Sequence, residues 1–175
     1  MKFISTEIAG LYVIEIEPIQ DDRGFFARSY CQHEFQAHNL VSRLVQCNIS
    51  FNRQKGTVRG MHLQLAPKGE EKLVRCTQGA IHDVVVDLRK DSNTFGKYFE
   101  VQLTSQNHKM LYIPQGLAHG FQTLEAETEV FYQMSEFFDG KCASGIRYND
   151  PICKFKFPLE ISKISDKDLS YVDFQ

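Results

Sequence analysis

The chain has 175 residues, of which 42% are hydrophobic, and its formal net charge at pH 7 is −2. A chain of this length is most simply one domain, spanning residues 1–175, with enough apolar residues to form a core. The charge excludes a basic field for nucleic acid, and no apolar run reaches the roughly 20 residues of a membrane-spanning helix, so we expect neither as a partner.

The cysteines and the N-terminal segment bear on the cellular compartment. The five cysteines are odd in number, and their spacing matches no zinc or redox motif. We therefore expect free thiols in a reducing, cytoplasmic compartment. Glu7 interrupts the first apolar stretch, which argues against a signal peptide.

The first half of the chain predicts strands and one short helix. The expected elements are, in order, a strand over 9–18, a turn over 21–24, an aromatic strand over 25–28, a helix over 31–39 and a strand over 43–52. On the last of these strands, Gln46, Asn48 and Ser50 share one face. Facing inward, they would line a polar pocket; facing outward, they would be ordinary sheet surface.

The second half of the chain is a series of short strands. They are expected over 58–64, 72–75, 80–89, 98–103, 110–114, 115–124 and 128–134. Strands at this spacing, with Gly and Pro turns and no long helical pattern, predict an all-β sandwich or barrel. Residues 165–169 predict a capped final helical turn.

The strand over 58–64 carries the residues with the most chemical content. Its alternation places His62 and Gln64 on one face and their apolar neighbours on the other. Arg59 precedes them, and Lys72 begins the next strand. An imidazole, a guanidinium and an ammonium together suit an anionic ligand that must lose a proton. Taken alone, the stretch also fits a strand with ordinary surface charges.

Two stretches resemble the paired motifs of the cupin superfamily. Residues 114–119 match the second motif, in which a Pro-x-Gly turn presents His119 to the mouth of the barrel. The first motif includes His62 but has Gln64 where a second ligand His is usual. Even with Glu70 or Glu71 as a further ligand, His62 and His119 are too few for a tight transition-metal site. The resemblance thus implies an all-β cupin-type jelly roll (a double-stranded β-helix) with short peripheral helices and no metal or cofactor.

A more specific resemblance comes from an ordered set of motifs between residues 10 and 170. The set is Arg23-Gly24-Phe25-Phe26, Gln46-x-Asn48-x-Ser50, Arg59-Gly60-x-His62-x-Gln64, Lys72-Leu73-Val74-Arg75, Asp83-Val84-x-Val86-Asp87-x-Arg89, Ile113-Pro114-x-Gly116-x-Ala118-His119-Gly120-Phe121, Tyr132, Asn149-Asp150 and Ser165-x-Lys167-Asp168. Together these motifs resemble the dTDP-4-dehydrorhamnose 3,5-epimerase family.

This resemblance implies a homodimeric isomerase that inverts C3, C5 or both in a nucleotide-linked, most simply dTDP-linked, 4-keto-6-deoxyhexose. It implies that His62 is the base, oriented by Asp168, and that Tyr132 is the acid on the opposite face of the sugar. Lys72 would stabilise the enolate oxygen. The substrate contacts that it implies are Arg23, Phe26, Arg28, Gln46, Asn48, Arg59, His119 and Lys167, with Phe26 reaching across from the partner subunit.

The chain also departs from the family pattern. Phe137 and Phe138 stand where the family usually has tyrosine, and Tyr148 stands where tryptophan is common. These differences leave open the nucleotide, dTDP or CDP, and the number of inverted centres. The alternatives are a single-centre epimerase acting on a CDP-linked sugar, a non-catalytic cupin that binds sugar nucleotides, and a metal-dependent cupin oxygenase or isomerase.

Overall fold

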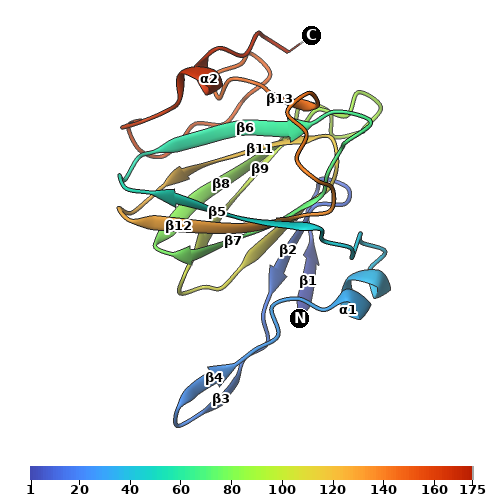
Figure 1. The fold of residues 1–175 in the computed structure, drawn as a ribbon, viewed down its shortest axis with the longest axis vertical. Helices are drawn as coiled ribbons and strands as arrows, with labels where there is room; N and C mark the ends of the chain where they lie inside the picture. Colours follow the sequence, from blue (N-terminus) through green and yellow to red (C-terminus); the bar gives the residue numbers. More distant parts are fainter. Residues whose placement is uncertain (175) are drawn as a thin grey trace.

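The structure is a computed structural model that describes residues 1–174 and is built mainly from β-strands (Figure 1). Its strands are β1 (Lys2–Ser5), β2 (Tyr12–Glu15), β3 (Ile19–Asp21), β4 (Gly24–Phe26), β5 (Gln46–Asn52), β6 (Val58–Gln64), β7 (Lys72–Gln78), β8 (Ala80–Asp87), β9 (Tyr98–Thr104), β10 (Met110–Ile113), β11 (Leu117–Thr123), β12 (Thr128–Met134) and β13 (Ala143–Gly145). The helices are α1 (Gln32–Ala37) and α2 (Asp166–Leu169). Among the described residues, no helix has the length and apolar character needed to cross a membrane.

The strands form two antiparallel sheets that face each other. In hydrogen-bonding order, one sheet is β1-β2-β10-β7-β12-β5 and the other is β13-β6-β11-β8-β9. The chain crosses between the sheets at every step from β5 to β8, and again from β9 to β13. This is jelly-roll topology, and it confirms the predicted all-β cupin-type fold with short peripheral helices. The remaining strands, β3 and β4, form a hairpin that projects from the body (Figure 1).

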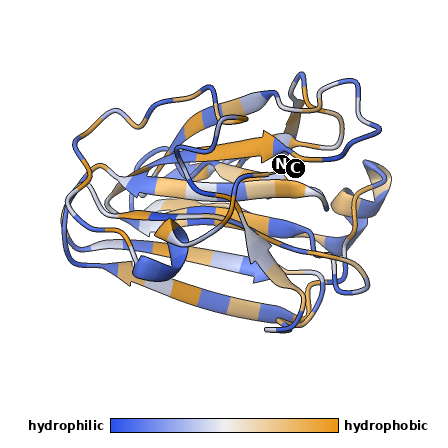
Figure 2. Ribbon diagram, turned by 90° about the horizontal axis from the view of Figure 1, so that it is seen from above, coloured by the Kyte–Doolittle hydropathy of each residue, from blue (hydrophilic) through white to orange (hydrophobic). Residues whose placement is uncertain are grey.

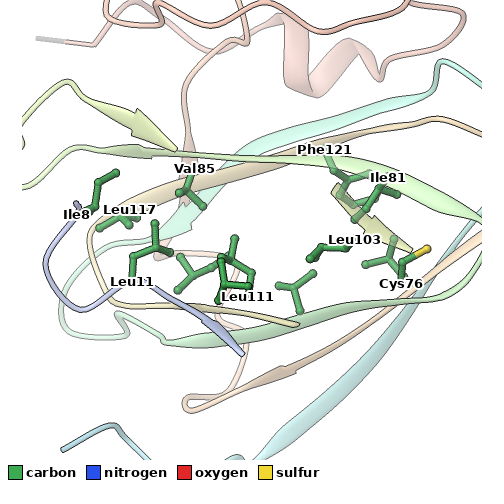
Figure 3. Close-up of a cluster of buried hydrophobic side chains, with 13 residues drawn as sticks. Ile8, Leu11, Cys76, Ile81, Val85, Leu103, Leu111, Leu117 and Phe121 are labelled. Atoms are coloured by element: carbon green, nitrogen blue, oxygen red, sulfur yellow. The ribbon is translucent and has the colours of Figure 1, made fainter. Parts of the chain in front are cut away.

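Apolar side chains from both sheets meet between them and form the main core (Figure 3). Removal of this apolar surface from water is the principal force that holds the sheets together. The cluster comprises Ile8, Leu11, Val13, Val74, Cys76, Ile81, Val85, Leu103, Leu111, Ile113, Leu117, Phe121 and Val130. Phe121 and Val130 also border a cavity between the two sheets, so the core ends where this cavity begins.

Each sheet also buries part of its outer face. On the six-stranded sheet, Phe35 of α1 packs with Leu73 and Met110. On the five-stranded sheet, Phe155 of the C-terminal segment packs with Met61 of β6. Figure 2 shows hydrophilic and hydrophobic residues alternating along some strands and hydrophobic residues dominating others. Because the C-terminal segment lies on β6, it brings α2 to that strand, as Figure 1 shows.

The structure agrees with the expected helices but differs from the sequence expectations in several short strands. The helix expected over 31–39 is α1, and the capped turn expected over 165–169 is α2, so both are confirmed. The strand expected over 9–18 is reduced to β2, because Leu11 N donates to Ile8 O and closes a turn. Three strands were not expected: β1, β3 and β13, with four, three and three residues, are too short to show a clear alternation.

The loop after β8 is organised by one buried carboxylate, that of Asp87. Its oxygens accept hydrogen bonds from the backbone and guanidinium of Arg89 and from the hydroxyls of Ser92 and Thr94, at 2.7–3.0 Å. Burial alone would raise the pKa of Asp87, but these donors hold it at about 2, below the ordinary 3.8. The ionised carboxylate therefore stabilises the folded state.

We expect this stabilisation to depend on pH. Because the pKa of Asp87 is lowered by folding, its contribution of about 2 kcal/mol is present above pH 4 and is lost as the pH falls toward 2, with about half gone at pH 3. Urea unfolding at pH 6, 4 and 3 should show the wild type losing its advantage over Asp87→Asn at low pH. Asp91→Asn, in the exposed part of the same loop, is the control, and a pH-independent difference between the wild type and Asp87→Asn would contradict this account.

Candidate active site

A cavity of about 400 Å³ opens between the two sheets, next to the main core. Its walls come from β6 and β11 of one sheet, from β5, β7 and β12 of the other, and from the segment that contains α2. A volume of this size suits a small-molecule ligand. The residues on its walls include Arg59, His62, Lys72, His119, Tyr132 and Lys167, so six of the residues singled out from the sequence come together here.

His62 is held by a carboxylate from the far end of the chain. Its Nε2 donates to Asp168 Oδ1 at 2.6 Å, and Gly60 N donates to Asp168 Oδ2 at 3.2 Å. The Asp168 side chain is buried because α2, capped by Ser165, lies on β6. Burial alone would raise the pKa of Asp168, but the hydrogen bonds from His62 and Gly60 keep it below its ordinary value. The imidazole therefore faces an ionised carboxylate and has Nδ1 left for other chemistry.

A close approach between β6 and β11 sets the floor of the cavity. Gly60 has a φ of +114°, and a Cβ there would lie 2.5 Å from Gly120 Cα and 2.6 Å from His119 O. Glycine is required where backbones come this close. The approach pairs His62 directly with His119 across the two strands. His119 Nε2 donates in turn to the buried Asp83, 2.9 and 3.0 Å from its two oxygens.

The opposite wall supplies a cation and a phenol. Lys72 Nζ donates to Glu70 Oε1 at 2.9 Å and to His62 O at 3.2 Å, so this side chain joins β7 to β6. Tyr132 lies on the inner face of β12, where it packs against the core. Burial is the main cause that raises the pKa of Tyr132, with the Glu70 charge adding to it and the Arg59 charge opposing it. Tyr132 therefore remains a protonated donor at neutral pH.

Gln64, at the position of a cupin metal ligand, has a structural role: its side chain holds two loops by hydrogen bonds. Its Oε1 accepts from Asp139 N at 2.6 Å, and its Nε2 donates to Lys68 O and Phe137 O at 2.9 and 3.3 Å. All of these partners are backbone atoms of two loops. Within residues 1–174, no cluster of three His, Cys, Asp or Glu side chains is arranged to hold a metal ion. The amide fastens the loop that places Phe138 on the cavity wall.

The polar row of β5 faces inward, toward the other sheet. Asn48 pairs with Tyr132 across β5 and β12, and directly paired residues of an antiparallel sheet share a face. Ser50 borders the cavity itself. Gln46 Nε2 donates to Asn48 Oδ1 at 3.2 Å, and Gln46 Oε1 accepts from Phe138 N at 3.1 Å. Gln46 and Asn48 therefore lie beside the cavity and support its rim.

Three of the expected substrate contacts lie away from this cavity. Arg23 and Phe26 belong to the projecting β3–β4 hairpin (Figure 1). There Arg23 pairs with Asp21, and Phe26 is 74% exposed. Arg28 pairs with Glu34 of α1. One copy of the chain does not bring these side chains to His62.

The structure also adds residues that the sequence did not indicate. Glu70, beside Lys72, and Tyr171, beside His62, both border the cavity. Glu70 had only been weighed as a metal ligand. Tyr171 follows α2 in an irregular segment, where no periodic pattern reveals the direction of a side chain.

Replacement of Gln64 tests its structural role. Gln64→Leu removes three part-buried hydrogen bonds between the Gln64 side chain and the two loops, so we expect the free energy of unfolding to fall by about 2–3 kcal/mol. The melting temperature should drop by about 5–10 °C for a chain of this size. Gln102→Leu, in an exposed position of β9, is the matched control in the same calorimetric measurement. Equal melting temperatures for the two variants would refute the structural role.

Known proteins resemble this chain over nearly its whole length. The family model of dTDP-4-dehydrorhamnose 3,5-epimerase matches residues 5–175. The dTDP-4-dehydrorhamnose 3,5-epimerase of Shigella flexneri is 40% identical over 171 residues, which cover 97% of this chain and 94% of that protein.

Solved structures agree with the sequence comparison. The dTDP-4-dehydrorhamnose 3,5-epimerase of Bacillus anthracis, solved with TDP and PPi bound, has a TM-score of 0.95 at 38% identity, covering 99% of both chains. The dTDP-6-deoxy-D-glucose-3,5-epimerase of Legionella pneumophila, solved in complex with dTDP-4-keto-L-rhamnose, has a TM-score of 0.90 at 34% identity and covers 97% of this chain and 90% of its own. With a matching fold, a matching family model and these identities, the chain belongs to the dTDP-4-dehydrorhamnose 3,5-epimerase family of isomerases.

Proposed function

We propose that this protein inverts C3 and C5 of a dTDP-linked 4-keto-6-deoxyhexose, a step in the synthesis of rhamnose and related deoxysugars of cell-surface polysaccharides such as lipopolysaccharide. The observation that carries the proposal is the His62–Asp168 pair on one wall of the cavity, with Tyr132 on the wall contributed by the other sheet. Inversion of a carbon next to a ketone requires a base on one face and an acid on the other.

The proposed chemistry is two proton transfers at each inverted carbon. His62 Nδ1 takes the proton that the C4 ketone has made acidic, and the electron pair moves into an enolate. The Lys72 ammonium stabilises the enolate oxygen, and the Asp168 carboxylate stabilises the imidazolium. Tyr132, kept protonated by its raised pKa, delivers a proton to the opposite face of the same carbon and restores the ketone.

This chemistry uses no metal or cofactor in our proposal. The Nε2 atoms of His62 and His119 are both engaged with aspartates, and the Gln64 amide is engaged with backbone atoms. Arg59 and Lys167 border the cavity and are placed to bind the diphosphate, with His119 completing the contacts. Activity that survives dialysis against EDTA is therefore expected.

We propose further that the protein is a homodimer in which the β3–β4 hairpin reaches the second copy. A two-stranded hairpin is marginally stable by itself in water. Here Ile19 and Phe26 are 72% and 74% exposed, and Ile49 and Phe51 are exposed on the edge strand β5. Covering this apolar surface with a second copy would carry Arg23 to a neighbouring cavity, where its guanidinium suits a diphosphate. Phe26 and Arg28 would approach the same ligand.

A cytoplasmic location completes the proposal. All five cysteines are free thiols, which is typical of a reducing compartment. We propose as well that residues 1–175 act as one jelly-roll domain.

Deuterium exchange separates the proposed base from the proposed acid. In D2O with dTDP-4-keto-6-deoxyglucose, His62→Ala should abolish both exchange and inversion, because the enolate does not form. Tyr132→Phe should exchange with retention of configuration, since His62 alone can return a deuteron. Each loss should be about 10²–10⁴-fold, as is typical for general acid or base groups. NMR of the sugar protons reports which positions exchange and which are inverted.

The same experiment can also give results that contradict the proposed function. Normal inversion by Tyr132→Phe, or normal exchange by His62→Ala, would remove the assigned roles. Exchange at C3 or C5 alone in the wild type would identify a single-centre epimerase. Preferential turnover of the CDP-linked sugar would show that the substrate carries CDP and not dTDP. No exchange with either sugar would favour a binding protein.

Mixed dimers test whether Arg23 acts in the neighbouring copy. Arg23→Ala and His62→Ala should each be inactive, yet a dimer with one subunit of each has one complete site if Arg23 acts across the interface. Random mixing in a two-fold dimer makes about a quarter of all sites complete, so about a quarter of the activity should return. The His62→Ala and Lys72→Ala mixture is the control and should stay inactive. Sedimentation as a monomer, or no recovery in the first mixture, would contradict the proposed dimer.

A further inference from the structure

Tyr171 lies against the ring of the proposed base. Its ring centroid is 6.3 Å from that of His62, and the two planes meet at 66° in an edge-to-face arrangement. It borders the cavity on the same side as Asp168, three residues earlier in the chain. Burial, followed by the charge of Asp168, raises the pKa of the Tyr171 phenol. The hydroxyl is therefore protonated and uncharged next to the His62–Asp168 pair.

A missing side chain on the neighbouring strand makes room for this ring. Gly145 of β13 pairs directly with His62 of β6. A Cβ on Gly145 would lie 2.7 Å from two carbons of the Tyr171 ring, far closer than van der Waals contact. The aromatic ring thus fills the space that a side chain at position 145 would occupy. A residue with a Cβ at position 145 would collide with this ring and also with Met61 O, so the arrangement needs glycine there.

The segment that carries Tyr171 is fixed on both sides. Before it, the Ser165 side chain caps α2 and Asp168 is bonded to β6. After it, Phe174 N donates to Asp150 Oδ2 at 2.8 Å, and Asp173 pairs with Arg147. The position of the ring is therefore determined by contacts at both ends of a short stretch, rather than by its contact with His62.

His62 needs a second constraint that this ring can supply. The imidazole is 43% exposed, and its only side-chain hydrogen bond among the described residues is the one from Nε2 to Asp168. One hydrogen bond restrains Nε2 but still lets the plane of the ring tilt by rotation about the Cβ–Cγ bond. Such turning would move Nδ1, the atom proposed to accept the proton. A displacement of about 1 Å in a reacting atom can cost 10²-fold in rate.

We propose that Tyr171 is a positioning residue that holds the His62 ring in the orientation needed for proton abstraction, acting through its aromatic ring rather than its hydroxyl. This rests on the proposed role of His62 as the base. The Asp168 hydrogen bond fixes one ring nitrogen, and the Tyr171 edge fixes the plane of the ring. Gly145 is the third member of the arrangement, because it leaves the space that Tyr171 fills.

The test compares three variants of the full-length protein with dTDP-4-keto-6-deoxyglucose as substrate. Tyr171→Ala should lower kcat by about 10–100-fold with KM changed by less than about threefold, since it disturbs the base and not the bound ligand. Deuterium exchange should fall by the same factor as inversion, because both begin with abstraction by His62. Tyr171→Phe keeps the ring and should recover kcat to within about threefold. Val172→Ala, at an exposed position of the same segment, should behave as wild type.

A spectroscopic signature separates positioning from general loss of structure. The ring resonances of His62, observed in protein labelled with ¹³C,¹⁵N-histidine, should shift in Tyr171→Ala and return in Tyr171→Phe. Those of His119, held by Asp83, should remain in place in both variants. If Tyr171→Ala does not fold, Tyr171→Leu keeps the apolar bulk without the aromatic edge and should show the same fall in kcat.

Several results would overturn the inference. A rise in KM at constant kcat would make Tyr171 a ligand contact. Loss of inversion with exchange intact in Tyr171→Phe would make its hydroxyl a proton donor. Unchanged kinetics in both Tyr171→Ala and Tyr171→Leu would leave the ring without a role in the reaction. Full activity in His62→Ala would instead refute the proposed function, so the two failures are distinguishable.

Discussion

The carboxylate of Asp168 is the interaction on which the arrangement of the active site depends. One oxygen accepts from the His62 ring and the other from Gly60 N, so a single group fixes both a side chain and the strand beneath it. It is separated from His62 by 106 residues in the chain. The jelly roll makes this contact possible, because the C-terminal segment packs its apolar side chains on the outer face of the five-stranded sheet. The packing of the C-terminal segment on the sheet therefore also orients the imidazole.

The cavity combines paired and available charges. Lys72 forms an ion pair with Glu70, while Asp168 and Asp83 accept hydrogen bonds from His62 and His119, so each of these groups is held by a partner. Arg59 donates to the neutral Asn52, and among the described residues Lys167 forms no ion pair, so positive charge remains for an anionic ligand. The two sets of groups therefore have different roles. The paired groups are held in place for the reaction, and the Arg59 and Lys167 cations attract the ligand.

The alternation of residues along strands explains which parts could be predicted from the sequence. It correctly placed His62 and Gln64 together, and the structure settles the open question of the Gln46, Asn48 and Ser50 row by turning it inward. The cap at Ser165 is likewise local, so it was predicted. By contrast, the β3–β4 hairpin is exposed on both faces and shows no alternation. The position of Tyr171 depends on Gly145 of another strand, and no local pattern records a contact between segments that distant.

The way Gln64 holds its loops has a consequence for how this enzyme can change. Gln64 binds the carbonyl of Phe137 and the amide of Asp139, and Gln46 binds the amide of Phe138, so the anchors are main-chain atoms. The side chains of residues 137 and 138 make none of these hydrogen bonds, and they are exposed. Substitutions at these two positions can therefore alter the rim of the cavity while the loop keeps its path. The path of the loop and the chemistry of the rim are thus set by different atoms of the same residues: main-chain atoms hold the loop, and side chains form the rim.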